Sequence, residues 1–156
     1  MANEIIWLRD VIESDLPVFY EQQKEPEAAY MADFPSRERE AFMAHWARIL
    51  GNEAVVIQTI LFNGQVAGNI VSFEMNGKRE AGYWLGKEFW GQGIATRALS
   101  GFLKLVKVRP LYAHVVKDNI GSRRVLEKCG FSICGQDREF SSLRGAEVEG
   151  YMLELS

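Results

Sequence analysis

The sequence of 156 residues has little of what marks the specialised classes of protein. Its two cysteines, Cys129 and Cys134, fit neither a disulfide framework nor a zinc pattern, so we expect two buried structural thiols. Because no cluster of His, Cys, Asp or Glu has metal-ligand spacing, no metal is expected. No apolar run reaches the roughly 18 residues of a membrane-spanning helix, and no signal-peptide pattern opens the chain.

The chain also lacks a strong excess of positive charge. Its formal net charge of −3 argues against a nucleic-acid-binding surface. The sequence has no linker, repeat or low-complexity tract, and its length fits one domain, residues 1–156, that buries roughly 70% of its unfolded surface. We therefore expect a cytoplasmic single-domain protein that binds neither nucleic acid nor membrane. Monomer and homodimer are both open.

The central stretch, Glu80 to Val106, combines three kinds of local pattern. Glu80–Leu85 is apolar and aromatic, as expected of a buried strand, and glycines then recur between Gly86 and Gly93. From Ile94 onward, apolar residues recur at helical spacing. The sequence thus predicts a strand, a glycine-rich loop and a helix in direct succession.

This succession favours binding of an anion. The first N–H groups of a helix have no partner inside it, and the helix dipole adds partial positive charge there. Gly91 and Gly93 have no side chains, so a pyrophosphate can approach the backbone closely. The dinucleotide fingerprint G-x-G-x-x-G fails because Thr96 occupies its third glycine position, and the P-loop pattern is absent.

The loop Trp90-Gly91-Gln92-Gly93-Ile94-Ala95 resembles the acetyl-CoA loop of the GNAT N-acetyltransferase superfamily, Gln/Arg-x-x-Gly-x-Gly/Ala. Gly93 and Ala95 match this signature, whereas Trp90 replaces the usual Gln or Arg. With Thr96, the loop reads W-G-x-G-x-A-T, which is similar to the subgroup that contains the ribosomal-protein N-terminal acetyltransferases.

A second segment strengthens this resemblance. The stretch from Asn119 through Ser122 to Gly130 and Phe131 is similar to the N-x-x-S…L-E-K-x-G-F segment of that subgroup. It follows the short apolar run Leu111–Val116, as the family order requires. Two matched segments in the right order are far more specific than either alone.

The resemblance implies a mixed α/β class and the GNAT acyl-CoA N-acyltransferase fold. We expect a central, mostly antiparallel sheet, a splayed pair of strands that admits the pantetheine arm of CoA, and about four helices. Ser14 and Ser36 are expected to cap the first two helices, with a loop at Lys24–Pro35 between them. Asn63-Gly64 and Asn76-Gly77 predict tight hairpins that join three consecutive strands. The expected strands are Ile5–Val11, Ala54–Phe62, Gln65–Glu74, Arg79–Leu85, Leu111–Val116, Phe131–Phe140 and Glu147–Leu155.

The family likewise suggests which residues bind acetyl-CoA. Trp84 and Leu85 would offer backbone groups to the pantetheine arm and the thioester oxygen. A packed core strand is compatible with this role, because only the backbone is used. The pyrophosphate would be held by the loop residues Gly91, Gln92, Gly93, Ile94, Ala95 and Thr96. Asn119 is a candidate contact to CoA or water, with helix capping as the alternative.

Two residues are candidates for the chemistry itself. Glu80 aligns by position with the catalytic base of histone acetyltransferases in the superfamily; a solvated strand-end carboxylate is an equally open interpretation. Many members carry a tyrosine acid where Leu126 stands, so Ser122 is the nearest donor to the leaving thiolate, with helix capping or packing as the rival. The cations Arg97, Arg123, Arg124 and Lys128 are candidate phosphate contacts or solvated charges. His45 reads as a surface or core-edge residue, and His114 reads as a core-edge residue.

The sequence therefore predicts an N-acetyltransferase that moves an acetyl group from acetyl-CoA to a primary amine by direct transfer in a ternary complex. The amine is open: a protein N-terminus, a polyamine, an antibiotic or a small metabolite all fit. Tyr30, Met31, Phe34 and Trp46 suggest an aromatic wall on the acceptor side or, alternatively, ordinary core. One rival function is a GNAT-fold domain that binds acyl-CoA as a sensor or scaffold without turnover, and another is an acyltransferase that uses a longer acyl donor.

Overall fold

A computed structural model describes residues 5–156, which form one seven-stranded sheet. The strands lie in the order β1-β2-β3-β4-β5-β7-β6. Every neighbouring pair is antiparallel except β4 and β5, which are parallel. The mixed α/β class and the mostly antiparallel sheet are therefore confirmed. The strands are β1 (Ile6–Asp10), β2 (Val56–Phe62), β3 (Gln65–Met75), β4 (Lys78–Leu85), β5 (Leu111–Val116), β6 (Ser132–Ser141) and β7 (Ala146–Leu155).

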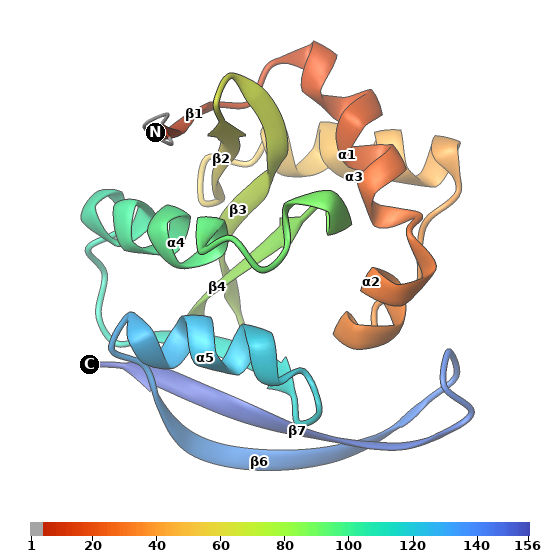
Figure 1. Cartoon of the computed structure of the whole chain (residues 1–156). Helices are drawn as coiled ribbons and strands as arrows, with labels where there is room; N and C mark the ends of the chain where they lie inside the picture. The colour runs from red at the N-terminus through yellow and green to blue at the C-terminus, as the bar shows by residue number, and fades with distance from the viewer. Residues whose placement is uncertain (1–4) are drawn as a thin grey trace.

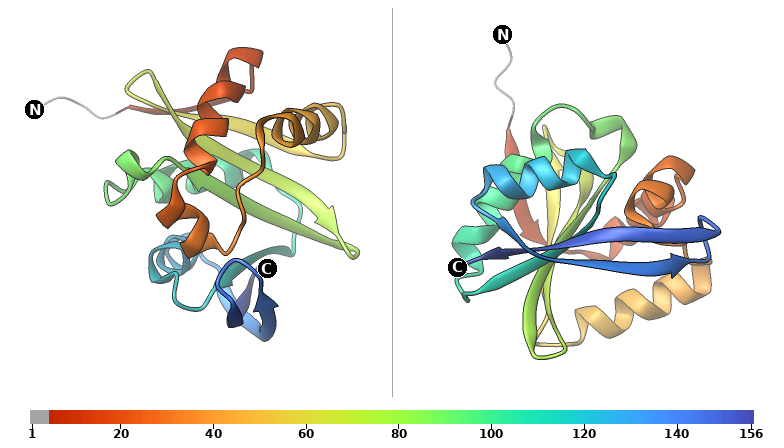
Figure 2. Two further views of the ribbon diagram at one scale, coloured as in Figure 1. Left: turned by 90° about the vertical axis from the view of Figure 1, so that its right-hand side faces the viewer. Right: turned by 90° about the horizontal axis from the view of Figure 1, so that it is seen from below.

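Helices cover both faces of this sheet. One face carries α1 (Leu16–Gln23), α2 (Pro26–Ala32) and α3 (Arg39–Leu50), and the other carries α4 (Ile94–Leu105) and α5 (Ile120–Lys128) (Figures 1 and 2). Two short 3-10 turns, η1 (Glu13–Asp15) and η2 (Lys87–Phe89), precede α1 and α4. Within residues 5–156, no helix is long and apolar enough to cross a membrane.

The three strands β2, β3 and β4 form the meander expected from the Asn-Gly pairs. Asn63 and Asn76 have φ angles of 49° and 53°, and the glycines that follow them have φ angles of 83° and 76°. Two consecutive positive φ values are what a two-residue hairpin turn requires. These hairpins lead the chain directly into β4 and the glycine loop.

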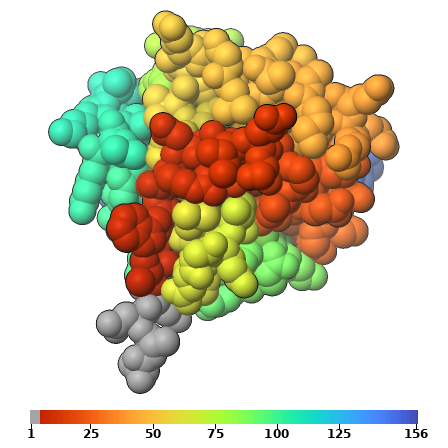
Figure 3. Space-filling model, turned by 90° about the horizontal axis from the view of Figure 1, so that it is seen from above, coloured from red at the N-terminus to blue at the C-terminus, as the bar shows by residue number. Residues whose placement is uncertain are grey.

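Two apolar clusters hold the layers together. The larger lies between the sheet and the helices α4 and α5, with Ile94, Leu99 and Phe102 of α4 almost fully buried. Burying each such side chain contributes about 1.5–3 kcal/mol. The smaller cluster, Phe19, Phe42 and Trp46, joins α1 and α3 to the opposite face. Figure 3 shows α1 (red) lying between α3 (gold) and the β2–β3 hairpin (yellow).

The N-terminal third differs from the sequence prediction in one element. The expected loop Lys24–Pro35 contains α2, so residues 5–156 form five α-helices where about four were expected. The side chain of Glu25 caps α2 by accepting from the Ala28 N–H at 2.6 Å, and Pro26 supplies a fixed φ at the first helical position. Asp33 ends the helix with a left-handed φ of 51°.

The predictions of two helix caps and of one buried thiol were also wrong. Glu38, not Ser36, occupies the cap position of α3. Ser14 falls inside η1, and the neighbouring Asp15 accepts hydrogen bonds from Arg9, the Ile12 N–H and Thr59. Cys134 is exposed rather than buried, because β6 is an edge strand of the sheet, whereas Cys129 is half-buried.

The strands β4 and β5 diverge, as the family resemblance implies. Within the described chain their register contains one pair, Glu80 with Tyr112, at the beginning of both strands. Because the strands run in parallel, they separate toward their carboxyl ends at Leu85 and Val116. This divergence opens a wedge in the middle of the sheet.

The neighbouring strand β3 approaches the far end of β4 very closely. Gly68 of β3 pairs with Leu85. A Cβ atom at Gly68 would lie 2.0 Å from the Trp84 carbonyl oxygen and 3.0 Å from the Leu85 Cα. Only glycine fits there, so this position fixes where the end of β4 lies.

Candidate active site

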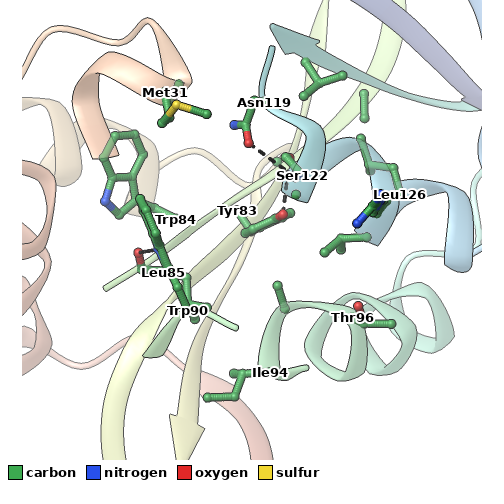
Figure 4. Close-up of a pocket in the computed structure, with 18 of the residues that line it drawn as sticks. Met31, Tyr83, Trp84, Leu85, Trp90, Ile94, Thr96, Asn119, Ser122 and Leu126 are labelled. Carbon is green, nitrogen blue, oxygen red and sulfur yellow. Dashed lines mark hydrogen bonds between the residues drawn. The ribbon is translucent and has the colours of Figure 1, made fainter. Parts of the chain in front are cut away.

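A cavity of about 700 Å³ lies at the carboxyl ends of β4 and β5, between α4 and α5 (Figure 4). It brings together most of the residues that the sequence analysis singled out, although they come from four separate segments of the chain. Nine of the predicted residues line it: Trp84, Leu85, Gly91, Gly93, Ile94, Ala95, Thr96, Asn119 and Ser122. Gln92 and Glu80 do not.

The glycine loop forms one end of the cavity. Gly91 and Gly93 have φ angles of 74° and 75°, a region that residues with side chains rarely adopt. Gly93 is the N-cap residue of α4, and no side chain caps this helix. The first N–H groups of α4 are thus available to an anion. Gln92 turns away, since its amide donates to the Glu88 carbonyl oxygen at 3.2 Å.

Trp90 has a structural role that its place in the motif did not indicate. Its indole N–H donates to the Leu85 carbonyl oxygen at 3.0 Å and so ties the loop to the end of β4. A Gln or Arg at this position would lack the rigid indole ring. The one hint in the sequence is that Trp90 departs from the family loop at this position.

The wall formed by β4 is fixed from the opposite face of the sheet. The Trp84 indole N–H donates to the Gln22 carbonyl oxygen in α1 at 3.3 Å. The Phe34 ring packs edge-on against the Trp84 indole with 6.2 Å between ring centroids. The backbone of Trp84 and Leu85 is therefore held by contacts on both faces and by Gly68 from β3.

Ser122 in the first turn of α5 is the central polar group of the cavity. Its backbone N–H is capped by the Asn119 side chain at 3.3 Å, so Asn119 caps the helix and lines the cavity at once. Its hydroxyl oxygen accepts from the Tyr83 hydroxyl at 3.2 Å. Leu126, one turn further along α5, is buried and lines the cavity without a polar atom. Sequence reasoning missed Tyr83, which reads as a core strand residue.

Glu80 lies at the closed end of the wedge and not on the cavity wall. Burial raises the pKa of its carboxyl group, while His114 and Lys78 act in the opposite direction. His114 lines the cavity and is exposed, unlike the core-edge histidine expected from the sequence. Its Nε2 lies 2.8 Å from Asp137 Oδ2. Glu80 and this pair form a small polar cluster on the face opposite α5.

Two of the four candidate phosphate contacts lie at the cavity. Arg124 and Lys128 line it, whereas Arg97 and Arg123 do not. Arg123 instead lies 3.6 Å from Glu127 and stacks its guanidinium over the Tyr151 ring at 5.8 Å. The cavity therefore has cationic side chains on its α5 wall and free helix N–H groups on its α4 wall.

A further wall of the cavity is formed in part by α2, where the sequence predicted a loop. Met31 lines the cavity, and Trp46 is buried in the smaller core cluster, so Trp46 belongs to the core. The guanidinium of Arg144, in the β6–β7 turn, donates to the Tyr30 carbonyl oxygen at 2.6 Å and pairs with Asp118 at 2.8 Å. This contact fixes α2 against the β6–β7 hairpin.

These features fit coenzyme A. The α4 N-terminus with two glycines suits a pyrophosphate, Arg124 and Lys128 suit a further phosphate, and the wedge suits an extended amide-containing arm. The residues that would hold it are Trp84, Leu85, Gly91, Gly93 and Thr96, with Ser122 beside the sulfur.

The comparison with protein families agrees with this geometry. Residues 6–132 match the family described as the acetyltransferase (GNAT) domain. The matched residues include β1 to β5, the glycine loop and both cavity helices. The chain therefore belongs to the GNAT acetyltransferase family.

Individual relatives are more distant. An uncharacterised N-acetyltransferase, p20 of Bacillus licheniformis, is 30% identical over 106 residues, which are 65% of this chain and 58% of that protein. The match thus spans less than two-thirds of that relative. The putative ribosomal N-acetyltransferase YdaF of Bacillus subtilis is 27% identical over 132 residues, 78% of this chain and 72% of that protein. Spermidine N-acetyltransferase from Vibrio cholerae, solved with CoA and spermine, shares the fold with a TM-score of 0.84 and 16% identity, covering 96% of this chain and 94% of its own.

Proposed function

We propose that the protein transfers an acetyl group from acetyl-CoA to a primary amine, directly and within a ternary complex. The observation that carries this proposal is the continuity of one cavity from the α4 N-terminus, through the β4–β5 wedge, to the hydroxyl of Ser122. An acyl-CoA donor needs these three features in this order. The relatives of the chain include named N-acetyltransferases.

Each group of residues has a distinct part in this proposal. Gly91, Gly93 and the first N–H groups of α4 bind the pyrophosphate, and the backbone of Trp84 and Leu85 positions the thioester. A backbone donor aimed at the thioester oxygen is worth about 3 kcal/mol in the transition state. Ser122 donates to the sulfur as the C–S bond breaks.

The acceptor amine must lose a proton as its nitrogen bonds to the acetyl carbon. Glu80 is the proposed base, and it acts from the closed end of the wedge directly or through a water. An α-amine with a pKa of ~7.7–8 needs this help less than a lysine-like amine at ~10.4. No covalent acetyl-enzyme is expected, because Cys129 is held against the Thr96 carbonyl oxygen and burial raises the pKa of its thiol.

A second function is favoured by two observations. Leu126 offers no proton at the family's tyrosine position, and Glu80 does not line the cavity. A domain that binds acetyl-CoA as a sensor or scaffold needs neither group. In both cases the ligand is acetyl-CoA without a metal, the location is the cytoplasm, and the protein is a monomer or a homodimer.

The two functions are separated by turnover with a panel of amines. CoA release from acetyl-CoA is followed with a thiol reagent in the presence of a peptide α-amine, spermidine or free lysine, and the acetylated product is weighed by mass spectrometry. We expect product from at least one amine, with release dependent on that amine. Tight binding of CoA without product from any amine would favour the sensor. The matched control is Gly93→Val, which should lose binding and turnover together.

A further inference from the structure

The contact between Tyr83 and Ser122 joins two parts of the chain that are 39 residues apart. Both side chains line the cavity, and Figure 4 shows the Tyr83 ring reaching from β4 toward the start of α5. Their hydroxyl oxygens are 3.2 Å apart. The inference below rests on the proposed function, in which Ser122 lies beside the sulfur of CoA.

Both partners of this contact are held in place. Tyr83 pairs with Ile70 across the β3–β4 ladder, and its ring packs against the larger core cluster. Ser122 is fixed through its backbone N–H, which the Asn119 side chain caps at 3.3 Å. The two hydroxyls therefore face each other through rigid elements.

The direction of the hydrogen bond decides where the Ser122 hydrogen points. A hydroxyl has a single hydrogen and two acceptor lone pairs. Burial raises the pKa of the Tyr83 hydroxyl, so it remains protonated near neutral pH and can act as the donor. When Ser122 accepts from Tyr83, its own hydrogen is left for a different acceptor, and hydroxyls linked in a chain polarise one another.

We propose that Tyr83 is a positioning residue for acetyl transfer, because its hydroxyl donates to Ser122 Oγ and thereby directs the Ser122 hydrogen toward the departing sulfur. As the amine nitrogen bonds to the acetyl carbon, the C–S bond breaks and its electron pair stays on sulfur. Ser122 stabilises this thiolate by a hydrogen bond, and Tyr83 keeps its proton. The amine proton leaves through the base or water, so charge and atoms balance. Tyr83 thus compensates in part for the tyrosine acid that is replaced by Leu126 in this chain.

The first test is a double-mutant cycle with Tyr83→Phe and Ser122→Ala. Tyr83→Phe keeps the ring and removes the hydroxyl, and it should lower kcat about tenfold with little change in the KM for acetyl-CoA. Ser122→Ala should lower kcat roughly 10- to 100-fold. In the Ser122→Ala background, Tyr83→Phe should change kcat by no more than about twofold, because its effect passes through the serine. Tyr20→Phe is the matched control: Tyr20 is in α1, packs edge-on against Phe42, does not line the cavity and should leave kcat unchanged.

The second test works without any acceptor and so does not depend on finding the amine. The thiolate absorbance of CoA bound to the protein is followed against pH. Hydrogen-bond donors to a thiolate lower the pKa of its thiol. Tyr83→Phe should therefore raise the pKa of the bound CoA thiol by about one pH unit, and Ser122→Ala should raise it by at least as much. Calorimetry with desulfo-CoA, which has no sulfur, should give the same affinity for wild type and all variants.

The outcomes separate this inference from the proposed function. If Ser122→Ala changes kcat and the thiol pKa but Tyr83→Phe changes neither, the positioning role of Tyr83 is refuted while the proposed function stands. If neither variant moves the thiol pKa, the role of Ser122 is wrong as well, and the inference fails with it. A lower affinity of Tyr83→Phe for desulfo-CoA would assign Tyr83 to the shape of the cavity instead.

Discussion

Replacing Gly68 with alanine tests how firmly the end of β4 is positioned. The added Cβ would lie 2.0 Å from the Trp84 carbonyl oxygen, and its other close neighbours are also backbone atoms of β4. A flexible side chain could rotate away from such a contact, but a paired strand has to move by about an ångström. Overpacking typically costs about 1–3 kcal/mol. Because backbone must move here, we expect a loss of roughly 2–4 kcal/mol in the free energy of unfolding.

The same displacement should impair acetyl transfer, because Trp84 and Leu85 supply the proposed backbone contacts to the thioester. A misplacement of about 1 Å can cost about 10²-fold in rate. We therefore expect kcat/KM to fall about 10²-fold at a temperature at which the variant is still folded. The melting temperature should fall by about 5–15 °C, since each kcal/mol corresponds to about 2–4 °C for a protein of this size.

The matched control makes the same chemical change where the structure has room. Gly101 lies in α4, and a Cβ there would meet Leu8 Cδ1 at 3.6 Å, an ordinary contact. Alanine is the better helix former by up to about 1 kcal/mol, so Gly101→Ala should leave stability unchanged or raise it. Thermal unfolding and steady-state kinetics of both variants check this pair. A Gly68→Ala protein with wild-type melting temperature and kcat/KM would refute the close approach of β3 to β4.

Three further predictions concern the loop, the base and one buried carboxylate. Gly93→Val should weaken CoA binding by about 10- to 100-fold in calorimetry, because the side chain meets the phosphate and φ is 75° there; unchanged affinity would remove the loop from the binding site. Glu80→Gln should cost about tenfold in rate with an α-amine and about 10²–10⁴-fold with a lysine-like amine. Because burial raises the pKa of Glu80, kcat/KM of the wild type should fall on the acid side at a higher pH than an ordinary glutamate would give, and this fall should vanish in the variant. Equal rates of wild type and variant at pH 6 with the best acceptor would exclude Glu80 as the base. Asp15→Asn should lower the free energy of unfolding by about 2–3 kcal/mol. This is less than the ~3–5 kcal/mol lost when a fully buried ion pair is broken, because the Arg9 side chain is 33% exposed. Burial acts to raise the pKa of Asp15, but hydrogen bonds from Arg9, the Ile12 N–H and Thr59 outweigh it and leave the pKa lowered. The stability from Asp15 is thus present above about pH 4 and lost as the pH falls through the folded-state pKa. The difference in the free energy of unfolding between wild type and variant should therefore stay constant from pH 7 to about pH 4 and narrow below it, which chemical unfolding checks.

Local signals were sufficient for much of the fold. The Asn-Gly pairs predicted both hairpins because their positive φ angles are a property of two adjacent residues. The apolar periodicity after Gly93 predicted α4 for a similar reason. The run Leu111–Val116 was predicted with its observed bounds. In each case the pattern that identifies the element lies within the element.

The remaining features depend on contacts between distant residues. The seven-residue α2 was read as a loop because a glutamate caps it, where serine, threonine, aspartate or asparagine is the usual residue. Tyr83 contacts Ser122 only because the sheet register places the Tyr83 side chain next to the start of α5. Arg144 reaches the Tyr30 carbonyl oxygen across 114 residues of chain. No periodicity or spacing in the sequence encodes such pairs.

The wedge between β4 and β5 places two sheet edges in the interior of the molecule. Edge strands on a protein surface can pair with strands of other chains and so promote aggregation. Here the edges face each other and, among residues 5–156, meet at the pair of Glu80 and Tyr112. A slender chain with amide groups can enter from the wide end and supply hydrogen bonds that the strands do not make with each other. Bound acyl-CoA would then take the place of an eighth strand that can dissociate. Its binding would connect the β1–β4 and β5–β7 halves of the sheet through hydrogen bonds.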